Sequence, residues 1–154
     1  KKIKILEFGI LKGASVALWQ QAFSKAQIFG ADKNVTMWKK YAGDLERVTV
    51  LVGNQKDPGF IENRVKTCGK FDIIVDDASH APTDQWALFE SLWPTLNIGG
   101  FYIVEDTYKS YRDRNEGAVN VPNTLAAWVE RIYTDHSVMS VQFYYNVCVI
   151  QKGI

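Results

Sequence analysis

The sequence predicts an α/β fold: a doubly wound, mostly parallel sheet with an antiparallel edge strand near the C-terminus. Two observations indicate this fold. Short apolar runs rich in valine and isoleucine alternate along the chain with segments whose apolar residues recur at helical spacing. Near the C-terminus, two further strand-like runs are separated only by Tyr145 and Asn146, which is typical of an antiparallel hairpin.

Length and composition favour a single globular domain over residues 1–154. The chain has 154 residues, of which 47% are hydrophobic and 23% charged, so it can bury a full core. The formal net charge of +1 argues against nucleic acid as a partner. No run reaches the roughly 18 apolar residues that a membrane helix needs, which argues against a membrane partner. Cys68 and Cys148 lie far apart without metal-type spacing, which favours a reducing, cytoplasmic location.

The first strand is expected at Lys2–Phe8, followed by a glycine turn and a helix from about Ser15 to Phe23. Glycines at this place let the backbone turn sharply beside a ligand, and the helix start offers free N–H groups. The spacing Gly9-x-x-x-Gly13 differs from the G-x-G-x-x-G pattern of dinucleotide sites, and Glu7 would repel a pyrophosphate. A cationic or hydroxyl-rich ligand therefore fits this turn better than a pyrophosphate does. The alternative is an ordinary strand–turn–helix joint.

Two further strands are expected at Gln27–Ala31 and Val48–Val52, each followed by polar residues or glycine. Asp32 lies about 20 residues beyond the glycine turn, where a carboxylate can accept both ribose hydroxyls of an adenosine-type ligand. It could also be a simple turn residue. Asn54 and Gln55 follow the third strand and either read an adenine edge or only form the turn. Helices are expected at Met37–Ala42 and from Pro58 to about Thr67.

The fourth strand, Phe71–Val75, leads directly into Asp76, Asp77 and His80. Its apolar run is typical of a strand covered on both faces of a parallel sheet. Ligands of open α/β sheets bind outside the carboxyl ends of the strands. Two carboxylates and an imidazole at such a place are costly to bury unless they are paired. We therefore treat them as functional candidates; the alternative is that the aspartates cap the next helix and His80 is a surface residue.

The fifth strand, Phe101–Val104, ends at Glu105 and Asp106. The stretch Thr107–Val121 is polar and lacks a clear period, so we expect a substrate loop or lid there. Asn123 is expected to cap the last helix. The other expected elements are a helix at Thr83–Leu92, a turn at Asn97–Gly100, a helix from Thr124 to about Thr134, and strands at Val138–Tyr144 and Val147–Lys152.

The segment Glu7–Gly13, EFGILKG, resembles the ExGxxxG nucleotide motif of class I S-adenosylmethionine-dependent methyltransferases, and Asp32 resembles their ribose-binding acid. The order of the expected elements is similar to that family over nearly the whole chain. The resemblance implies a Rossmann-like, seven-stranded sheet with the strand order 3-2-1-4-5-7-6, and S-adenosylmethionine as a cofactor. The residues expected to bind this cofactor are Glu7, Gly9, Gly13, Ser15, Asp32, Asn54, Gln55 and Asp76.

More narrowly, Asp76–His80 (DDASH) and the pair Glu105-Asp106 resemble motifs of metal-dependent sugar O-methyltransferases of the mycinamicin and elloramycin type, and of cephalosporin-hydroxylase-like proteins. Ala78 stands where that group usually has glycine, and Asn54 stands where it usually has aspartate. The resemblance implies that Mg²⁺ is bound by Asp77, Glu105 and Asp106. It also implies that His80 is the general base and that Asp77 is catalytic as well as a metal ligand.

The same residues suit this chemistry on physical grounds. Adjacent parallel strands lie about 4.8 Å apart, so acids at the ends of the fourth and fifth strands converge if those strands are neighbours. Close carboxylates repel one another unless a cation lies between them, and Mg²⁺ prefers such oxygen ligands. A metal-bound hydroxyl loses its proton more readily, and His80 could accept that proton because imidazole titrates near neutral pH. His136 is expected to be a solvated residue.

The sequence thus predicts an S-adenosylmethionine- and Mg²⁺-dependent O-methyltransferase for a hydroxyl of a sugar or another small-molecule acceptor, and it is compatible with a homo-oligomer. The alternative is a non-catalytic, nucleotide-binding module of a larger protein. A nicotinamide or nucleotide-sugar oxidoreductase is disfavoured, because the chain lacks G-x-G-x-x-G and a suitably placed Tyr-x-x-x-Lys relay. A nucleic-acid methyltransferase is disfavoured by the lack of a basic stripe.

Overall fold

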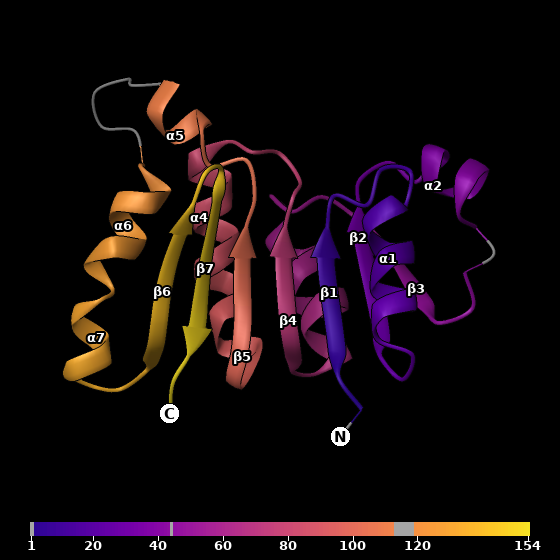
Figure 1. Cartoon of the computed structure of the whole chain (residues 1–154). Helices are drawn as coiled ribbons and strands as arrows, with labels where there is room; N and C mark the ends of the chain where they lie inside the picture. Colours follow the sequence, from indigo (N-terminus) through magenta and orange to yellow (C-terminus); the bar gives the residue numbers. More distant parts are fainter. Residues whose placement is uncertain (1, 44, 113–118) are drawn as a thin grey trace.

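A computed structural model describes residues 2–43, 45–112 and 119–154 and contains a seven-stranded sheet with the order β3-β2-β1-β4-β5-β7-β6 (Figure 1). The predicted doubly wound fold and strand order are confirmed. The strands are β1 (Lys4–Phe8), β2 (Gln27–Asp32), β3 (Val48–Val52), β4 (Phe71–Asp76), β5 (Leu96–Val104), β6 (Val138–Tyr144) and β7 (Val147–Lys152).

The strand directions match the prediction. The strands β3, β2, β1, β4 and β5 pair in parallel, whereas β7 pairs antiparallel with both β5 and β6. The hairpin places β7 inside the sheet and leaves β6 at its edge. The carboxyl ends of β1, β2, β4 and β5 therefore lie along one edge, drawn at the top of Figure 1.

Helices cover both faces of the sheet. Side chains of successive strand residues point to opposite faces, so Ile5 joins one apolar cluster and Leu6 the other. Val16 of α1 packs into the Ile5 cluster and Phe89 of α4 into the Leu6 cluster, and Figure 1 shows these two helices on opposite faces. The helices are α1 (Ala14–Ala22), α2 (Thr36–Tyr41), α3 (Pro58–Phe60), α4 (Pro82–Leu92), α5 (Lys109–Arg112), α6 (Val121–Ala127) and α7 (Glu130–Tyr133).

Backbone hydrogen bonds continue past the strand ends and join the loops of the carboxyl edge. The Gly9 N–H donates to the Ala31 carbonyl at 2.8 Å, and the Asp77 N–H donates to the Phe8 carbonyl at 3.0 Å. The Glu105 N–H donates to the Asp76 carbonyl at 3.0 Å. These hydrogen bonds thus fix the positions of the residues that follow β1, β4 and β5 relative to one another.

Two predicted elements differ in detail. The chain is helical over the predicted range from Pro58 to about Thr67, but only Pro58–Phe60 is α-helical (α3); a π-helical turn at Ile61–Val65 and a 3₁₀ turn at Lys66–Cys68 continue it. Strand β5 already begins at Leu96, so the predicted turn at Asn97–Gly100 lies within it; a register shift against β4 accommodates the glycines.

The predicted substrate loop, Thr107–Val121, also differs from expectation in the part that the structure describes. Residues 109–112 form the short helix α5, and residues 113–118 lie outside the described part of the chain. The next helix begins at Val121, so its N-cap is Asn120, whose side chain accepts from the Asn123 N–H at 3.0 Å. Pro122 sits in the first turn, where its missing N–H costs nothing. None of the helices in the described ranges has the length and apolarity needed to cross a bilayer.

Candidate active site

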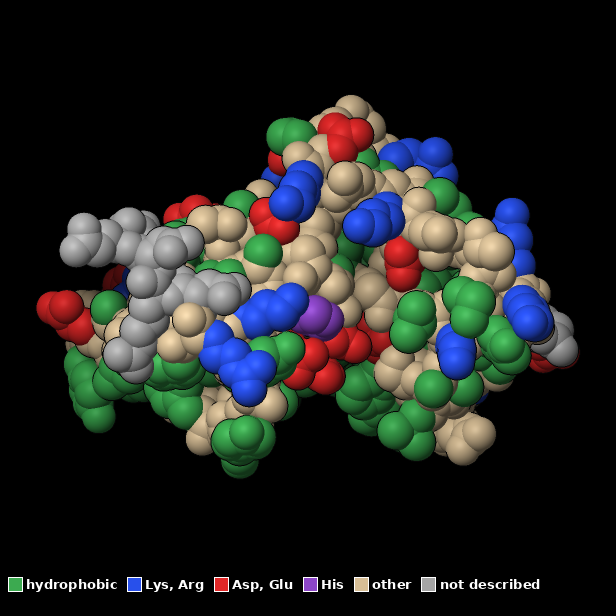
Figure 2. Space-filling model, turned by 90° about the horizontal axis from the view of Figure 1, so that it is seen from above, with side chains coloured by type: hydrophobic (Ala, Val, Ile, Leu, Met, Phe, Trp, Pro, Cys, Tyr) green, Lys and Arg blue, Asp and Glu red, His purple; other side chains and the backbone are tan. Residues whose placement is uncertain are grey.

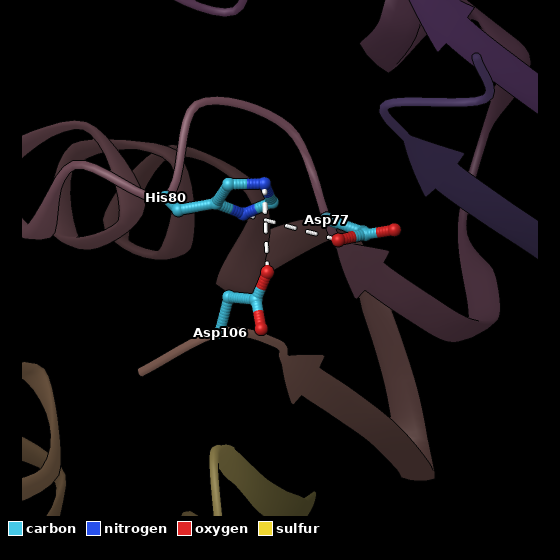
Figure 3. A group of neighbouring side chains, drawn as sticks. All are labelled: Asp77, His80 and Asp106. Atoms are coloured by element: carbon cyan, nitrogen blue, oxygen red, sulfur yellow. Dashed lines mark ion pairs between the residues drawn. The ribbon is translucent and has the colours of Figure 1, made fainter. Parts of the chain in front are cut away.

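Three side chains from the ends of β4 and β5 meet at the carboxyl edge of the sheet (Figure 3). The Nδ1 atom of His80 lies 3.8 Å from Oδ1 of Asp77, and its Nε2 atom lies 3.7 Å from Oδ2 of Asp106. One ligand atom from each of the three residues lies within 4.8 Å of the other two, which is close enough to share one ion. The expected convergence of acids from these two strands is therefore present for Asp77 and Asp106.

The backbone in this cluster is unusual. His80 has φ 56° and Asp106 has φ 52°, which is the left-handed region that non-glycine residues seldom adopt. Such backbone is held in place by surrounding contacts and tends to occur at functional sites. Here it turns both side chains toward Asp77, as Figure 3 shows.

The loop that carries His80 is fixed by side-chain contacts. The Ser79 N–H donates to Oε1 of Gln55 at 3.1 Å, and the Ser79 hydroxyl donates to Oδ2 of Asp84 at 2.8 Å. Nζ of Lys56 lies 2.8 Å from the same Asp84 oxygen. The loops after β3 and β4 are therefore coupled, and His80 is placed by a connected polar network.

Negative charge accumulates in the cluster. Burial, followed by the charge of Asp106, raises the pKa of Asp77 to about 6. Burial also raises the pKa of Glu105, with further contributions from the charges of Asp77 and Asp106, whereas His80 lowers it. Figure 2, which looks onto this edge, shows acidic side chains gathered beside a histidine in the middle of the face. Such mutual repulsion is relieved when a cation binds.

Glu105 was expected to be a third metal ligand, and it does not belong to the close group of Asp77, His80 and Asp106. It lies near enough to interact electrostatically with both aspartates. Its backbone carbonyl accepts from Nε2 of the buried Gln85 at 2.7 Å, which fixes the start of the loop after β5. Metal ligation by Glu105 stays a prediction.

A pocket lies next to the cluster, between the ends of β1, β2, β3 and β4. Its empty space, including the part open to solvent, is about 520 Å³. Among the residues expected to bind the cofactor, four line it: Gly9, Asp32, Asn54 and Gln55. The lining residues that sequence reasoning missed are Phe8, Ala31, Lys33, Gly53, Lys56, Ala78 and Ser79; of these, Ala78 and Ser79 belong to the DDASH segment that it had singled out.

Two backbone N–H groups orient the carboxylate of Asp32, the expected ribose-binding acid. Its Oδ2 accepts from the Leu11 N–H at 3.2 Å, and its Oδ1 accepts from the Asn34 N–H at 3.0 Å. These two bonds orient the carboxylate at the pocket wall and leave lone pairs for further donors. Gln55 is oriented as well, because its Oε1 is occupied by Ser79 while its buried Nε2 has no protein partner.

The other four expected cofactor residues do not line the pocket. Glu7 is buried and accepts from the Ser15 hydroxyl and from Nε1 of Trp19, the latter at 2.7 Å, so it and Ser15 join β1 to α1. Gly13, with φ 82°, packs against Trp38. Asp76 is fully buried, and its burial raises its pKa to about 7. Contacts of these residues with a ligand stay predictions.

Comparison with known proteins finds methyltransferases that are similar to the chain, although no family model matches it. It is 28% identical to 8-demethyl-8-(2-methoxy-alpha-L-rhamnosyl)-tetracenomycin-C 3'-O-methyltransferase of Streptomyces olivaceus, over 98% of this chain and 45% of that protein. It is 34% identical to L-olivosyl-oleandolide 3-O-methyltransferase of Streptomyces antibioticus, over 71% of this chain and 29% of that protein. The chain thus spans less than half the length of these curated relatives.

Solved structures with the same fold include the MycE methyltransferase of mycinamycin biosynthesis. In complex with Mg and SAH it superposes with a TM-score of 0.85 at 23% identity, covering 99% of this chain and 46% of MycE. Its complex with Mg, SAH and mycinamycin VI gives a TM-score of 0.82 at 25% identity, with 99% and 45% covered. The resemblance to class I methyltransferases, and to sugar O-methyltransferases among them, is confirmed.

Proposed function

We propose that this chain is the catalytic part of an S-adenosylmethionine- and Mg²⁺-dependent O-methyltransferase that acts on a hydroxyl of a sugar or similar small molecule. The observation that carries the proposal is the adjacency of the Asp77–His80–Asp106 cluster to a pocket lined by Asp32, whose carboxylate two backbone N–H groups orient. The names of the relatives support a sugar hydroxyl as acceptor. A location in the cytoplasm, where the free thiols Cys68 and Cys148 would stay reduced, belongs to the same proposal.

The acidic residues fit a magnesium site. Asp77 and Asp106 would supply the oxygen ligands, with Glu105 beside them, and the repulsion that raises the pKa of Asp77 would be offset on binding. When bound, Mg²⁺ makes a coordinated substrate hydroxyl more acidic. His80 lies between the two aspartates, so its imidazole is placed to accept the proton that this hydroxyl releases.

The pocket fits the methyl donor. Asp32 would accept from the ribose hydroxyls, Gly9 leaves the backbone free of a side chain, and the unpartnered Nε2 of Gln55 would donate to the adenine, with Asn54 beside it. The other four expected cofactor residues would hold the walls of this pocket in place, in addition to any direct contact with the methyl donor. They are Glu7, Gly13, Ser15 and Asp76. S-adenosylmethionine supplies a methyl group that its positive sulfur already activates, so the chain contributes mainly position and deprotonation.

The test measures methyl transfer from labelled S-adenosylmethionine to 8-demethyl-8-alpha-L-rhamnosyl tetracenomycin C, which is the acceptor of another relative. We expect turnover that EDTA abolishes and Mg²⁺ restores. Replacing His80 by Ala should lower kcat at least about 100-fold, because a general base contributes that much, while calorimetric binding of SAH stays unchanged. His136→Ala, remote in sequence from the cluster, is the matched control and should retain full activity.

Two outcomes would contradict the proposal. One is failure of the folded protein to bind SAH at all. The other is a His80→Ala variant that turns over at the wild-type rate, which would exclude His80 as the general base.

A further inference from the structure

Three buried polar side chains lie beneath the carboxyl edge of the sheet, on the face that α4 covers. They are Asp76 at the end of β4, Tyr102 of β5 and Gln85 of α4, and each is fully buried. Each has one buried atom that meets no hydrogen-bond partner among the described protein atoms: Oδ2 of Asp76, the hydroxyl oxygen of Tyr102 and Oε1 of Gln85. A buried polar atom without a hydrogen bond is costly, so a group of three requires an explanation.

The three side chains come together from neighbouring elements. Ile74 pairs with Tyr102 in the β4–β5 register, and Asp76 lies two residues after Ile74, so its side chain points to the same face. The ring of Phe89 lies 5.0 Å from that of Tyr102, and Gln85 lies one helical turn before Phe89 on the same side of α4. Burial, followed by the charge of Asp76, raises the pKa of the Tyr102 hydroxyl, so the carboxylate and the hydroxyl lie close enough to interact.

The hydrogen bonds of these three groups cannot all be made without a further molecule. The carboxylate of Asp76 and the amide oxygen of Gln85 only accept, whereas Tyr102 has a single O–H to donate. A direct bond from Tyr102 to one acceptor leaves the other without a donor. A water molecule donates two protons and can accept the third from the tyrosine, so it satisfies all three atoms at once.

We propose that Asp76, Tyr102 and Gln85 bind one buried water molecule, which joins α4 to the ends of β4 and β5 beneath the candidate metal site. The water accepts from the Tyr102 hydroxyl and donates to Oδ2 of Asp76 and to Oε1 of Gln85. Buried waters typically make about three hydrogen bonds, as this one does. The water site is independent of the proposed function.

The water bears on the position of the expected metal ligands. Asp76 directly precedes Asp77, and Nε2 of Gln85 donates to the Glu105 carbonyl at 2.7 Å. A water between Asp76 and Gln85 therefore connects the neighbour of one expected ligand to the backbone of another. Tyr102 belongs neither to the close group of acids and histidine nor to the pocket lining, so its role is that of a positioning residue. This second part rests on the proposed function.

A high-resolution crystal structure of the wild-type protein tests the water site. We expect one water peak at about 2.7–3.2 Å from Oδ2 of Asp76, from Oε1 of Gln85 and from the Tyr102 oxygen. In Tyr102→Phe, whose ring can still pack on Phe89, the peak should move or disappear. Direct contacts among the three wild-type side chains with no water between them would overturn the proposal, because Asp76 would then carry a proton and donate it to Gln85.

Calorimetry tests the positioning role, with Mg²⁺ and SAH titrated separately into each variant. We expect Tyr102→Phe to weaken Mg²⁺ binding about tenfold, which is the lower end of what loss of an outer partner costs a metal site, and to leave SAH binding unchanged. Gln85→Leu should weaken Mg²⁺ binding further, because it also removes the bond to the Glu105 carbonyl. Tyr144→Phe is the matched control, since it removes an exposed hydroxyl that donates to Gln142 on β6.

The double variant, Tyr102→Phe with Gln85→Leu, tests whether the two residues act through the same water. Its loss of Mg²⁺ affinity should be smaller than the product of the two single losses, because the water can be lost only once. Strictly multiplicative losses would mean that no shared water connects the two residues.

The remaining outcomes separate the two proposals. If Tyr102→Phe keeps the wild-type affinity for Mg²⁺, or loses affinity for Mg²⁺ and SAH alike, Tyr102 does not position the metal site. If the wild-type protein binds no Mg²⁺, the magnesium part of the proposed function fails and the positioning role fails with it. The crystal structure then still decides whether the water site exists.

Discussion

His80 lies between two carboxylates at distances too long for hydrogen bonds, 3.8 Å to Asp77 and 3.7 Å to Asp106. A cation bound by Asp77 and Asp106 would lie beside the imidazole, so the proposed metal site and the proposed general base would share one place at the edge of the sheet.

The raised pKa of Asp77 gives a prediction for metal binding. Because burial and the charge of Asp106 raise this pKa to about 6, the carboxyl is largely protonated at pH 5 and largely ionised at pH 7. A metal competes with the proton, so affinity rises with pH. We expect the affinity for Mg²⁺ to be about tenfold higher at pH 7 than at pH 5, measured by calorimetry.

The control is Asp77→Asn, which removes the titrating carboxyl and should weaken Mg²⁺ binding while reducing its pH dependence. Equal wild-type affinity at both pH values would contradict the prediction.

Residues of the site differ in how well the sequence predicts them. Asp77, His80 and Asp106 could be found, because each follows an apolar run that reads as a buried strand and such ends meet at one edge. Glu7 is a different case. Its sequence position suggests a ligand contact, which stays a prediction, whereas the hydrogen bonds that its carboxylate accepts from Ser15 and Trp19 were not predicted. Those partners lie eight and twelve residues away, and local patterns do not reveal such pairing.

At the scale of elements, the turn after β1 depends on Gly9. Its φ is 90°, and a Cβ atom there would lie 2.0 Å from the Asp77 carbonyl oxygen. Gly99, with φ 77°, is the matched control, because nothing lies within 4 Å of the Cβ that it lacks.

The two glycines should respond differently to alanine. Gly99→Ala should cost about 1–2 kcal/mol of unfolding free energy from left-handed backbone alone. Gly9→Ala adds a clash with backbone, and we expect a total of about 3 kcal/mol or more. Urea unfolding measures both values. Equal losses would show that the β1 turn can relax away from β4.

The sequence predicts the strands better than it predicts their limits. Runs such as Val48–Val52 coincide with observed strands, because β-branched residues favour extended backbone. The start of β5 was missed, since Gly99 and Gly100 suggest a turn. Pairing of Leu96 with Phe71 extends the strand through them instead, and the register shift needed for this is a tertiary effect.

At the scale of the whole molecule, the loops after β1, β2, β3 and β4 all contribute to the cofactor pocket, so one ligand would connect four parts of the fold. A ligand that binds only the folded state stabilises it. At 100 times its dissociation constant, SAH should add about 2.7 kcal/mol to the unfolding free energy. For a chain of this size the melting temperature should rise by about 5–10 °C.

Scanning calorimetry with and without SAH checks this prediction. Asp32→Ala should remove most of the rise, because it removes the carboxylate expected to hold the ribose. Glu90→Ala, at an exposed position of α4, should keep it. A full rise in the Asp32 variant would mean that SAH binds elsewhere or without that contact.

Both chain ends lie at the bottom of the sheet in Figure 1, whereas His80 and its partners lie at the top. A six-residue strand such as β4 separates these two edges by roughly 20 Å. An affinity tag or a surface tether attached at either end would accordingly point away from the reacting groups. Immobilised in that orientation, the molecule would expose its candidate active site to the bulk solution, which suits it to sensor chips and flow reactors.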